Sequence, residues 1–250
     1  MFQVKATVVG FMGDEDKYPC HFQHKIGDEF IYDGEKYIGR ICPGFSAALI
    51  PRMMEFFAAG PRMVPPPQYY YAFWYAPVSR RDESRKIYDG VGFRNVLESA
   101  VEPPRHIAGL KPKHAFDWPP DSDRTVFLDR STVICGDTRT SLVAKIEAFD
   151  LADKGDSVTY FRREMSILHK VIGKPGIRVD QILAEFTKEQ IEEIYPALSP
   201  ILIEILSEEL ELTGYLRIEE GKATATMKGE AKLEAFRKNL TQEERQALQI

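Results

Sequence analysis

The sequence predicts an α+β protein with two domains. Strand-type alternation and hairpin signals dominate the first 150 residues, whereas beyond about residue 160 the apolar residues recur with helical spacing. The short polar stretch 150–157 separates the two patterns. We therefore predict a small mixed α+β domain at 1–155 and a largely helical domain at 156–250.

The first domain contains clear strand, turn and helix signals. Residues 2–9 alternate apolar and polar side chains, as a half-buried strand does. Asp33-Gly34 is a strong hairpin turn signal, and Gly60-Pro61 ends a helical pattern. The predicted elements are a strand at 2–9, a hairpin at 29–38, a helix at 45–59, and strands at Phe127, 133–134 and 142–149.

A long insertion, at about 63–117, interrupts this domain. It carries the aromatic run 69–75, a basic cluster and several proline pairs. Aromatic rings offer stacking faces, and guanidinium groups bind planar anions in a bidentate manner. We expect a small-molecule site lined by Tyr70, Trp74, Arg80, Arg81 and Arg85. The alternatives are that the rings form strand core or a dimer interface.

The second domain has the element order of a small regulatory module. Its predicted elements are helices at 161–172, 179–186 and 188–212 (interrupted near Pro196 and Pro200), strands at 215–218 and 223–227, a helix at 229–240 and a short helix capped by Thr241 and Glu244. This order resembles the winged-helix domain of prokaryotic regulators. The resemblance implies a winged-helix domain as the second half of the α+β chain.

The three cysteines form the main candidate site. Cys20, Cys42 and Cys135 each lie beside a turn signal, and His24 can add a nitrogen donor. Three thiolates and one imidazole make a tetrahedral set that suits zinc or another thiolate-bound transition metal. His21 competes for the imidazole position. The alternatives are buried cysteines without metal, or three thiolates with an exogenous ligand, which would permit catalysis.

The same residues carry a resemblance to a family of small, uncharacterised prokaryotic proteins. That family has the pattern Cys-x-x-x-His-Lys-x-Gly-Asp, a Gly-x-Cys-Pro turn and a strand that ends in Cys-Pro-Asp. This chain matches over about residues 1–62 and 118–150, with Gly136 in place of the last proline. The resemblance implies a small α+β domain with its site at Cys20, His24, Cys42 and Cys135, and it implies no reaction. Asp28 of the first motif can accept a hydrogen bond from a ligating His24, or it can equally be a turn or cap residue.

Composition narrows the possible compartments and partners. A net charge of −5 disfavours nucleic acid as a bulk partner. Three cysteines in 250 residues argue against a disulfide framework. With no amino-terminal apolar segment of the signal-peptide kind, we expect a soluble, cytoplasmic protein that does not contact membranes.

The third helical stretch of the second domain indicates how that domain is used. Its only basic residue is Lys188, at its start, and it carries the acidic residues Glu192, Glu193, Glu204, Glu208, Glu209 and Glu211. DNA is therefore an unlikely partner, and we expect this domain to form a homo-oligomer. The sequence favours a metal-binding protein that recognises a small molecule. The alternatives are a metal-dependent enzyme acting on a small anionic or aromatic substrate, and a winged-helix transcriptional regulator.

Overall fold

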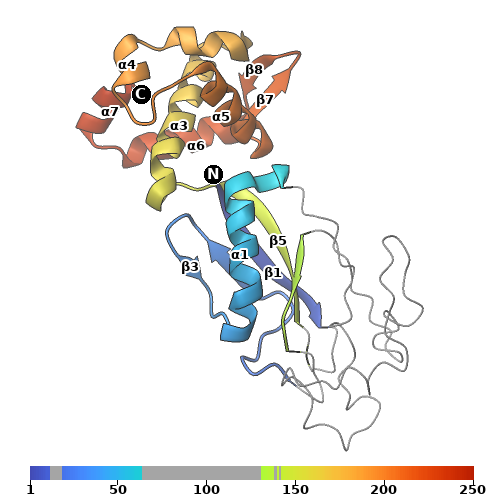
Figure 1. The fold of residues 1–250 in the computed structure, drawn as a ribbon. Coiled ribbons are helices and arrows are strands. Elements are labelled where there is room, and N and C mark those ends of the chain that lie inside the picture. Colours follow the sequence, from blue (N-terminus) through green and yellow to red (C-terminus); the bar gives the residue numbers. More distant parts are fainter. Residues whose placement is uncertain (12–18, 64–130, 138–139, 141) are drawn as a thin grey trace, which may run out of the picture.

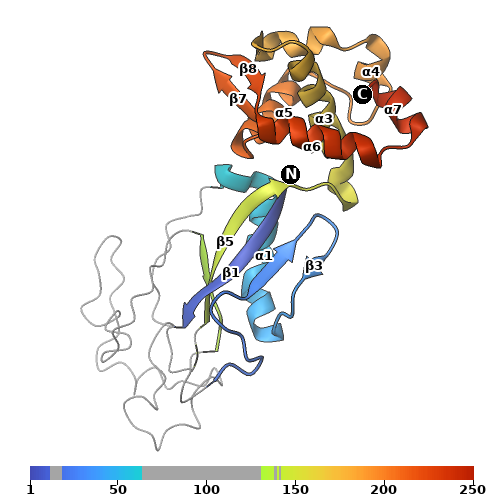
Figure 2. The same ribbon diagram turned by 180° about the vertical axis from the view of Figure 1, so that it is seen from behind.

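The computed structural model describes residues 1–11, 19–63, 131–137, 140 and 142–250, which form two lobes (Figures 1 and 2). The insertion and its aromatic run therefore lie outside the described residues, as does the strand predicted at Phe127. The first lobe contains β1 (Phe2–Phe11), β2 (Glu29–Tyr32), β3 (Tyr37–Ile38), α1 (Pro43–Ala59), the 3-10 helix η1 (Gly60–Arg62), β4 (Thr132–Ile134) and β5 (Leu142–Leu151).

The strands of the first lobe form one antiparallel sheet in the order β3-β2-β1-β5-β4. The predicted alternation of the first strand is confirmed, since Phe2, Val4, Ala6 and Val8 are buried along β1. β1 pairs with β5 so that Phe11 lies opposite Leu142. The end of β1 and the start of β5 therefore meet at the same end of the sheet.

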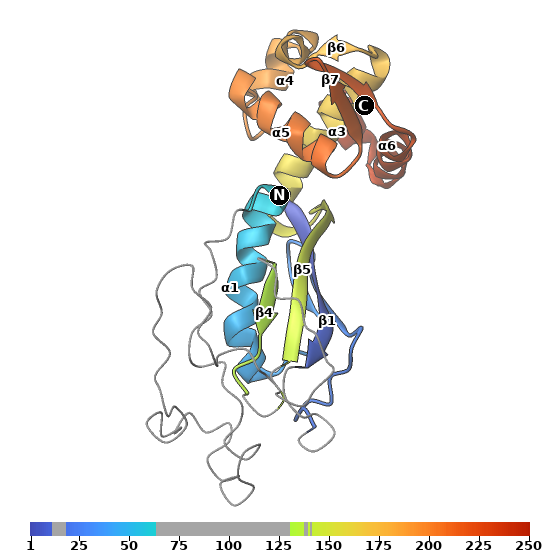
Figure 3. The ribbon, with the colours of Figure 1, turned by 90° about the vertical axis from the view of Figure 1, so that its right-hand side faces the viewer.

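Helix α1 lies alongside β4, β5 and β1 (Figure 3). Its buried residues are Phe45, Leu49, Met53, Phe56 and Phe57. The helix begins two residues before the predicted start, because Pro43 occupies its first turn without needing a hydrogen-bond acceptor. It ends at Gly60, whose φ of 55° is easily reached by glycine. The predicted end at Gly60-Pro61 is thus confirmed.

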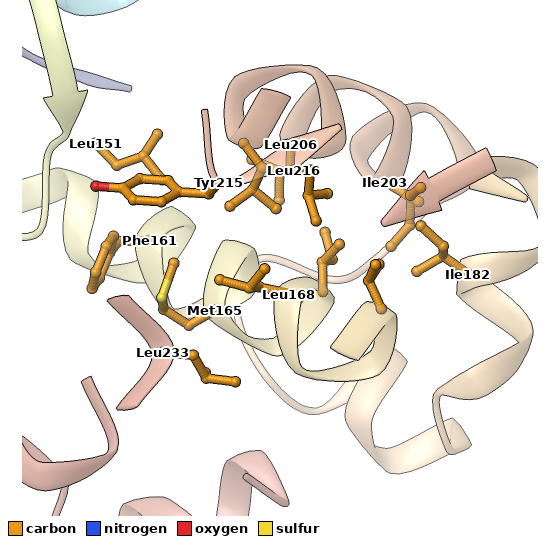
Figure 4. Close-up of a cluster of buried hydrophobic side chains, with 14 of the residues drawn as sticks. Leu151, Phe161, Met165, Leu168, Ile182, Ile203, Leu206, Tyr215, Leu216 and Leu233 are labelled. Atoms are coloured by element: carbon orange, nitrogen blue, oxygen red, sulfur yellow. The ribbon is translucent and has the colours of Figure 1, made fainter. Parts of the chain in front are cut away.

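The second lobe follows η5 (Gly155–Ser157), and the domain boundary predicted at 155–156 stays a prediction. It contains α3 (Val158–Gly173), β6 (Ile177–Arg178), η6 (Val179–Glu185), α4 (Lys188–Glu192), α5 (Pro200–Leu212), β7 (Leu216–Glu219), β8 (Lys222–Ala225), α6 (Met227–Asn239) and α7 (Gln242–Leu248). The strands form a small sheet in the order β6-β8-β7. Side chains of α3, α5 and α6 meet in the core of this lobe (Figure 4).

The α+β class is confirmed, and one predicted helix of the second lobe differs from the prediction. The segment predicted as a helix at 179–186 is the 3-10 helix η6, because so few residues between β6 and α4 cannot establish a stable α-helix. The stretch 188–212 is divided into α4 and α5, as the prolines predicted. The Thr241–Glu244 capping box is present.

Within the described residues, no helix has both the length and the apolar character needed to cross a membrane.

Candidate metal centre

The four predicted metal ligands lie at one end of the first-lobe sheet. Cys20 and His24 belong to the connection from β1 to β2, and Cys135 follows β4 immediately before β5. Cys42 precedes α1, after the β2–β3 hairpin has returned the chain to this end. The antiparallel topology therefore gathers four residues that are widely separated in the sequence.

The loop that carries His24 is fastened to the sheet by backbone hydrogen bonds. The Gly27 N–H donates to the Val8 carbonyl at 2.8 Å, and the Val8 N–H donates to the Asp28 carbonyl at 2.8 Å. A tight turn also joins the Gln23 N–H to the Cys20 carbonyl at 2.7 Å. The loop thus holds Cys20 and His24 close to each other.

The His24 ring is oriented by a carboxylate on one side and by aromatic rings on the others. Its Nδ1 lies 3.2 Å from Oδ2 of Asp28, which also accepts the Lys25 N–H at 3.0 Å. That backbone N–H is the largest cause holding the pKa of Asp28 below its usual range, and His24 adds to the effect. An ionised carboxylate can only accept, so Nδ1 carries a hydrogen and Nε2 is free to act as a ligand in the neutral ring.

The other nitrogen of His24 is buried and has no hydrogen-bond partner among the described residues. The ring meets Phe30 edge-on at a centroid distance of 5.2 Å and stacks with Phe22 at 6.0 Å. A buried polar atom without a partner costs about 1–3 kcal/mol. A metal ion at Nε2 would remove this cost. The Nδ1–carboxylate contact is the arrangement found behind many ligating histidines.

Cys42 is the residue that immediately precedes α1. Its carbonyl accepts hydrogen bonds from the N–H groups of Phe45 and Ser46, while its side chain caps no backbone group. The thiol therefore remains available at a helix amino terminus, where the helix dipole favours negative charge. Gly44 lies near the thiol, since a Cβ on this residue would be 3.7 Å from the Cys42 sulfur.

Cys135 supplies the buried thiol of the group. Burial raises its pKa to about 11, although the Asp137 N–H, 3.4 Å from the sulfur, acts in the opposite direction. Charge on Cys42 or Cys20 would raise the pKa of Cys135 further. All three cysteines are reduced, and all three belong to or pack against one apolar cluster. Without a metal, Cys135 is a neutral thiol at physiological pH and not a nucleophile.

In the described part of the chain, no group of three or more His, Cys, Asp or Glu side chains is arranged to hold a metal ion as it stands. The donor set and the orphaned His24 nitrogen fit a thiolate-binding metal, but the side chains must move toward one another to enclose it. His21, the competing imidazole, is exposed. The sequence did not indicate the aromatic contacts of His24, because Phe22 and Phe30 lie on different segments.

The small-molecule candidates Tyr70, Trp74, Arg80, Arg81 and Arg85 lie outside the described residues. The expected pocket near the cysteines stays a prediction.

No family model, no curated protein and no solved structure matches this chain. The resemblance carried by the cysteine motifs stays a prediction.

Proposed function

We propose that Cys20, His24, Cys42 and Cys135 bind one zinc ion, or another transition metal that prefers thiolates. The observation that carries the proposal is the His24 ring, whose Nδ1 is held by Asp28 while its buried Nε2 has no partner among the described residues. Four protein ligands fill a tetrahedral site and leave no position for water. The metal would therefore be structural, fastening the β1–β2 loop, α1 and the β4–β5 turn together.

The energy of metal binding exceeds the cost of closing the site. Structural zinc binds zinc-finger peptides with about 10–16 kcal/mol at neutral pH, including the cost of releasing thiol protons. Fixing one cysteine side chain costs at most about 2 kcal/mol of conformational entropy. Cys20 and Cys42 are only half-buried and lie outside regular elements, so their side chains can rotate toward Cys135 and His24.

The purified protein is expected to contain about one zinc per chain, because the four proposed ligands complete one tetrahedral site. Cys42→Ser should remove most of the metal and lower the melting temperature, because the serine hydroxyl is a poor zinc ligand. Metal content by mass spectrometry and the absorption of the cobalt-substituted protein would check this. The thiolate-to-cobalt charge-transfer band reports sulfur ligation independently of any activity.

Two histidines only three positions apart provide a matched control. His24→Gln should weaken metal binding strongly, whereas His21→Gln should leave it unchanged, because His21 is exposed. Asp28→Ala should weaken affinity by about 10–100-fold, the usual effect of removing a carboxylate that orients a ligating histidine. A metal-free protein that does not take up zinc or cobalt, or equal effects of the two histidine variants, would reject the proposed site.

We further propose that the centre supports the recognition of a small molecule by the insertion that follows α1. Support comes from the chain order, because in the sequence η1 precedes the insertion, and β4 and Cys135 follow it. A metal-dependent enzyme is the alternative. It would need an open metal position, and this arises if His24 is not a ligand and the three thiolates hold the metal alone.

The second lobe is proposed to be a winged-helix module. Support comes from the order of its elements, in which helix α3, strand β6, the helical segments η6, α4 and α5, and the β7–β8 hairpin follow one another. Exposed acidic residues on α5, namely Glu204, Glu208 and Glu211, would repel a phosphate backbone, so a DNA-binding regulator is the weaker alternative.

We propose that a second copy of the chain covers the outer face of α5. Ile201, Ile205 and Leu212 lie along one stripe of this helix and are 70%, 42% and 40% exposed. A two-fold contact pairs the same apolar patch of both copies, so it requires no other partner.

The double variant Ile201→Glu, Ile205→Glu is expected to convert an oligomer to a monomer, as measured by light scattering. Charge in an apolar interface is costly, whereas these exposed positions contribute little to the fold. Met227→Glu is the matched control, because Met227 is 87% exposed in the same lobe but lies on α6. A wild-type monomer, or a double variant with the wild-type mass, would contradict self-association through α5.

A further inference from the structure

The junction between the two lobes contains a buried pair of carboxyl groups. Glu164 on α3 is 1% exposed, and Glu209 on α5 is 5% exposed. Charged side chains are seldom buried to this degree unless each has a partner of opposite charge. The partners of these two glutamates are very different.

Glu209 is an ionised carboxylate whose two oxygens are both occupied by cations of the first lobe. Its Oε2 accepts from the Met1 amine at 2.6 Å, and its Oε1 accepts from Nη1 and Nη2 of Arg62, each at 3.1 Å. Burial raises the pKa of Glu209, but the cations around it outweigh burial and lower this pKa. The Met1 amine contributes most to the lowering. These bonds join η1 and the residue before β1 to α5, and so hold the two lobes together.

Glu164 has no such partner. Neither of its carboxyl oxygens accepts a hydrogen bond from any donor in the described residues. The charge of the Glu209 carboxyl, on the neighbouring helix α5, acts on Glu164. A buried carboxylate without a donor is strongly disfavoured, and two neighbouring carboxylates each disfavour the charge of the other. Because the oxygens of Glu209 accept from cations and those of Glu164 accept from no donor in the described residues, Glu164 is the group that carries a proton.

The charges around the pair agree with this assignment. Burial is the first cause that raises the pKa of Glu164 well above its usual range, and the charge of Glu209 adds to it. The Met1 amine and Lys232 lower the pKa of Glu164, but burial raises it by more than they lower it.

Lys232 and Arg62, two cations of the junction, already bind other carboxylates. Lys232 of α6 lies 3.0 Å from Asp150 of β5, which also accepts the Tyr215 hydroxyl, and Arg62 also lies 2.8 Å from Glu208. The Tyr215 ring lies beside Leu151 in the core (Figure 4). Because Lys232 and Arg62 already bind other carboxylates, neither is available to neutralise an ionised Glu164.

We propose that Glu164 carries a proton beside the ionised Glu209 and that this proton keeps the lobe junction closed. Loss of the proton would place two carboxylates side by side in a site that holds no donor for the second one. Water must then enter to solvate the new charge, and the ion pairs of Met1 and Arg62 with Glu209 are the contacts through which the lobes would separate.

The test compares the full-length protein with Glu164→Gln, whose amide keeps a donor for Glu209 but cannot ionise. A carboxyl with a raised folded-state pKa stabilises the fold fully below its unfolded pKa of about 4.3, and this stabilisation is lost as pH rises through the folded pKa. Between these two values, the wild-type unfolding constant should rise about tenfold per pH unit relative to the variant. Urea unfolding followed by helical circular dichroism measures this difference.

Small-angle X-ray scattering then tests whether the two lobes separate at the junction. The wild-type radius of gyration should increase at alkaline pH, and that of Glu164→Gln should increase less. Glu204→Gln, an exposed change on α5, should behave as wild type. Equal pH dependence of unfolding in wild type and Glu164→Gln would overturn the protonated Glu164. A difference in unfolding without a difference in scattering would overturn its role at the junction.

If Glu164→Gln does not fold, carbon-13 NMR of glutamate side chains in the wild-type protein decides the matter. One glutamate carboxyl should then titrate far above all the others. Titration of every glutamate near the ordinary pKa of about 4.3 would overturn the proposal.

Discussion

Arg163→Ala is expected to lower the melting temperature by about 8–16 °C, the largest loss from any single side chain discussed. The side chain is buried on α3, and its donors satisfy backbone carbonyl groups instead of a carboxylate. Leaving several buried carbonyls without donors costs about 1–3 kcal/mol each, partly recovered where water enters, so we expect a total of about 4 kcal/mol. In a chain of this size, 1 kcal/mol corresponds to about 2–4 °C. Thermal unfolding followed by circular dichroism measures the effect.

The loss is large because Arg163 organises the connection between α4 and α5. Its guanidinium donates to the carbonyls of Pro196 at 2.8 Å and Gln190 at 2.6 Å, and also to Ile191 and Ile194. This connection has no regular secondary structure of its own. Burial lowers the pKa of Arg163, but a guanidinium remains charged at physiological pH and keeps all its donors.

The neighbouring arginine provides the control. Arg162 is partly exposed and pairs with Glu244, so Arg162→Ala should cost about 1 kcal/mol or less. Arg163→Lys should fall between wild type and alanine, because an ammonium group cannot reach as many carbonyls as the planar guanidinium. Similar losses for Arg162→Ala and Arg163→Ala would show that the connection does not depend on these hydrogen bonds.

The sequence pattern predicted the elements well wherever one face alone is buried. The alternation along β1 and the apolar face of α1 follow this rule, and both elements were predicted. The helix α3 was also predicted, but its buried polar residues were not. Arg163 and Glu164 lie in its sequence as ordinary helical charges, and only the packing of α4 and α5 around α3 buries them. A pattern within one segment carries no information about what packs against it.

The candidate metal centre could be predicted only in part. The resemblance carried by the cysteine motifs implied which four residues belong together, and antiparallel topology brings them to one end of the sheet. The sequence also suggested that Asp28 accepts from His24, and this contact is confirmed. The burial of His24 between aromatic rings could not be predicted, because it depends on how the loop folds back onto Phe30.

Gly229→Ala is expected to destabilise the second lobe by about 2–4 kcal/mol, although alanine normally favours helices over glycine by about 1 kcal/mol. Gly229 lies in the first turn of α6, where its N–H donates to the Thr226 hydroxyl at 3.1 Å. A Cβ on this residue would lie 2.2 Å from the Tyr215 carbonyl oxygen, far inside any permitted contact. Urea unfolding would show the loss as a lower midpoint.

The Tyr215 backbone cannot move away cheaply, which is why steric overlap should outweigh helix propensity at this position. Its carbonyl accepts the Thr226 N–H at 3.0 Å, its N–H donates to Leu210 at 2.8 Å, and its ring is buried in the core. Gly173→Ala is the matched control, because Gly173 is exposed at the end of α3 and a Cβ there meets nothing within 4 Å. That change should be neutral or stabilise the protein by about 0.4–1 kcal/mol. The two substitutions add the same methyl group to two helices, so opposite signs would show that close packing of α6 on Tyr215 requires glycine. If both substitutions stabilised the protein, Gly229 would lie farther from the Tyr215 carbonyl than the structure indicates.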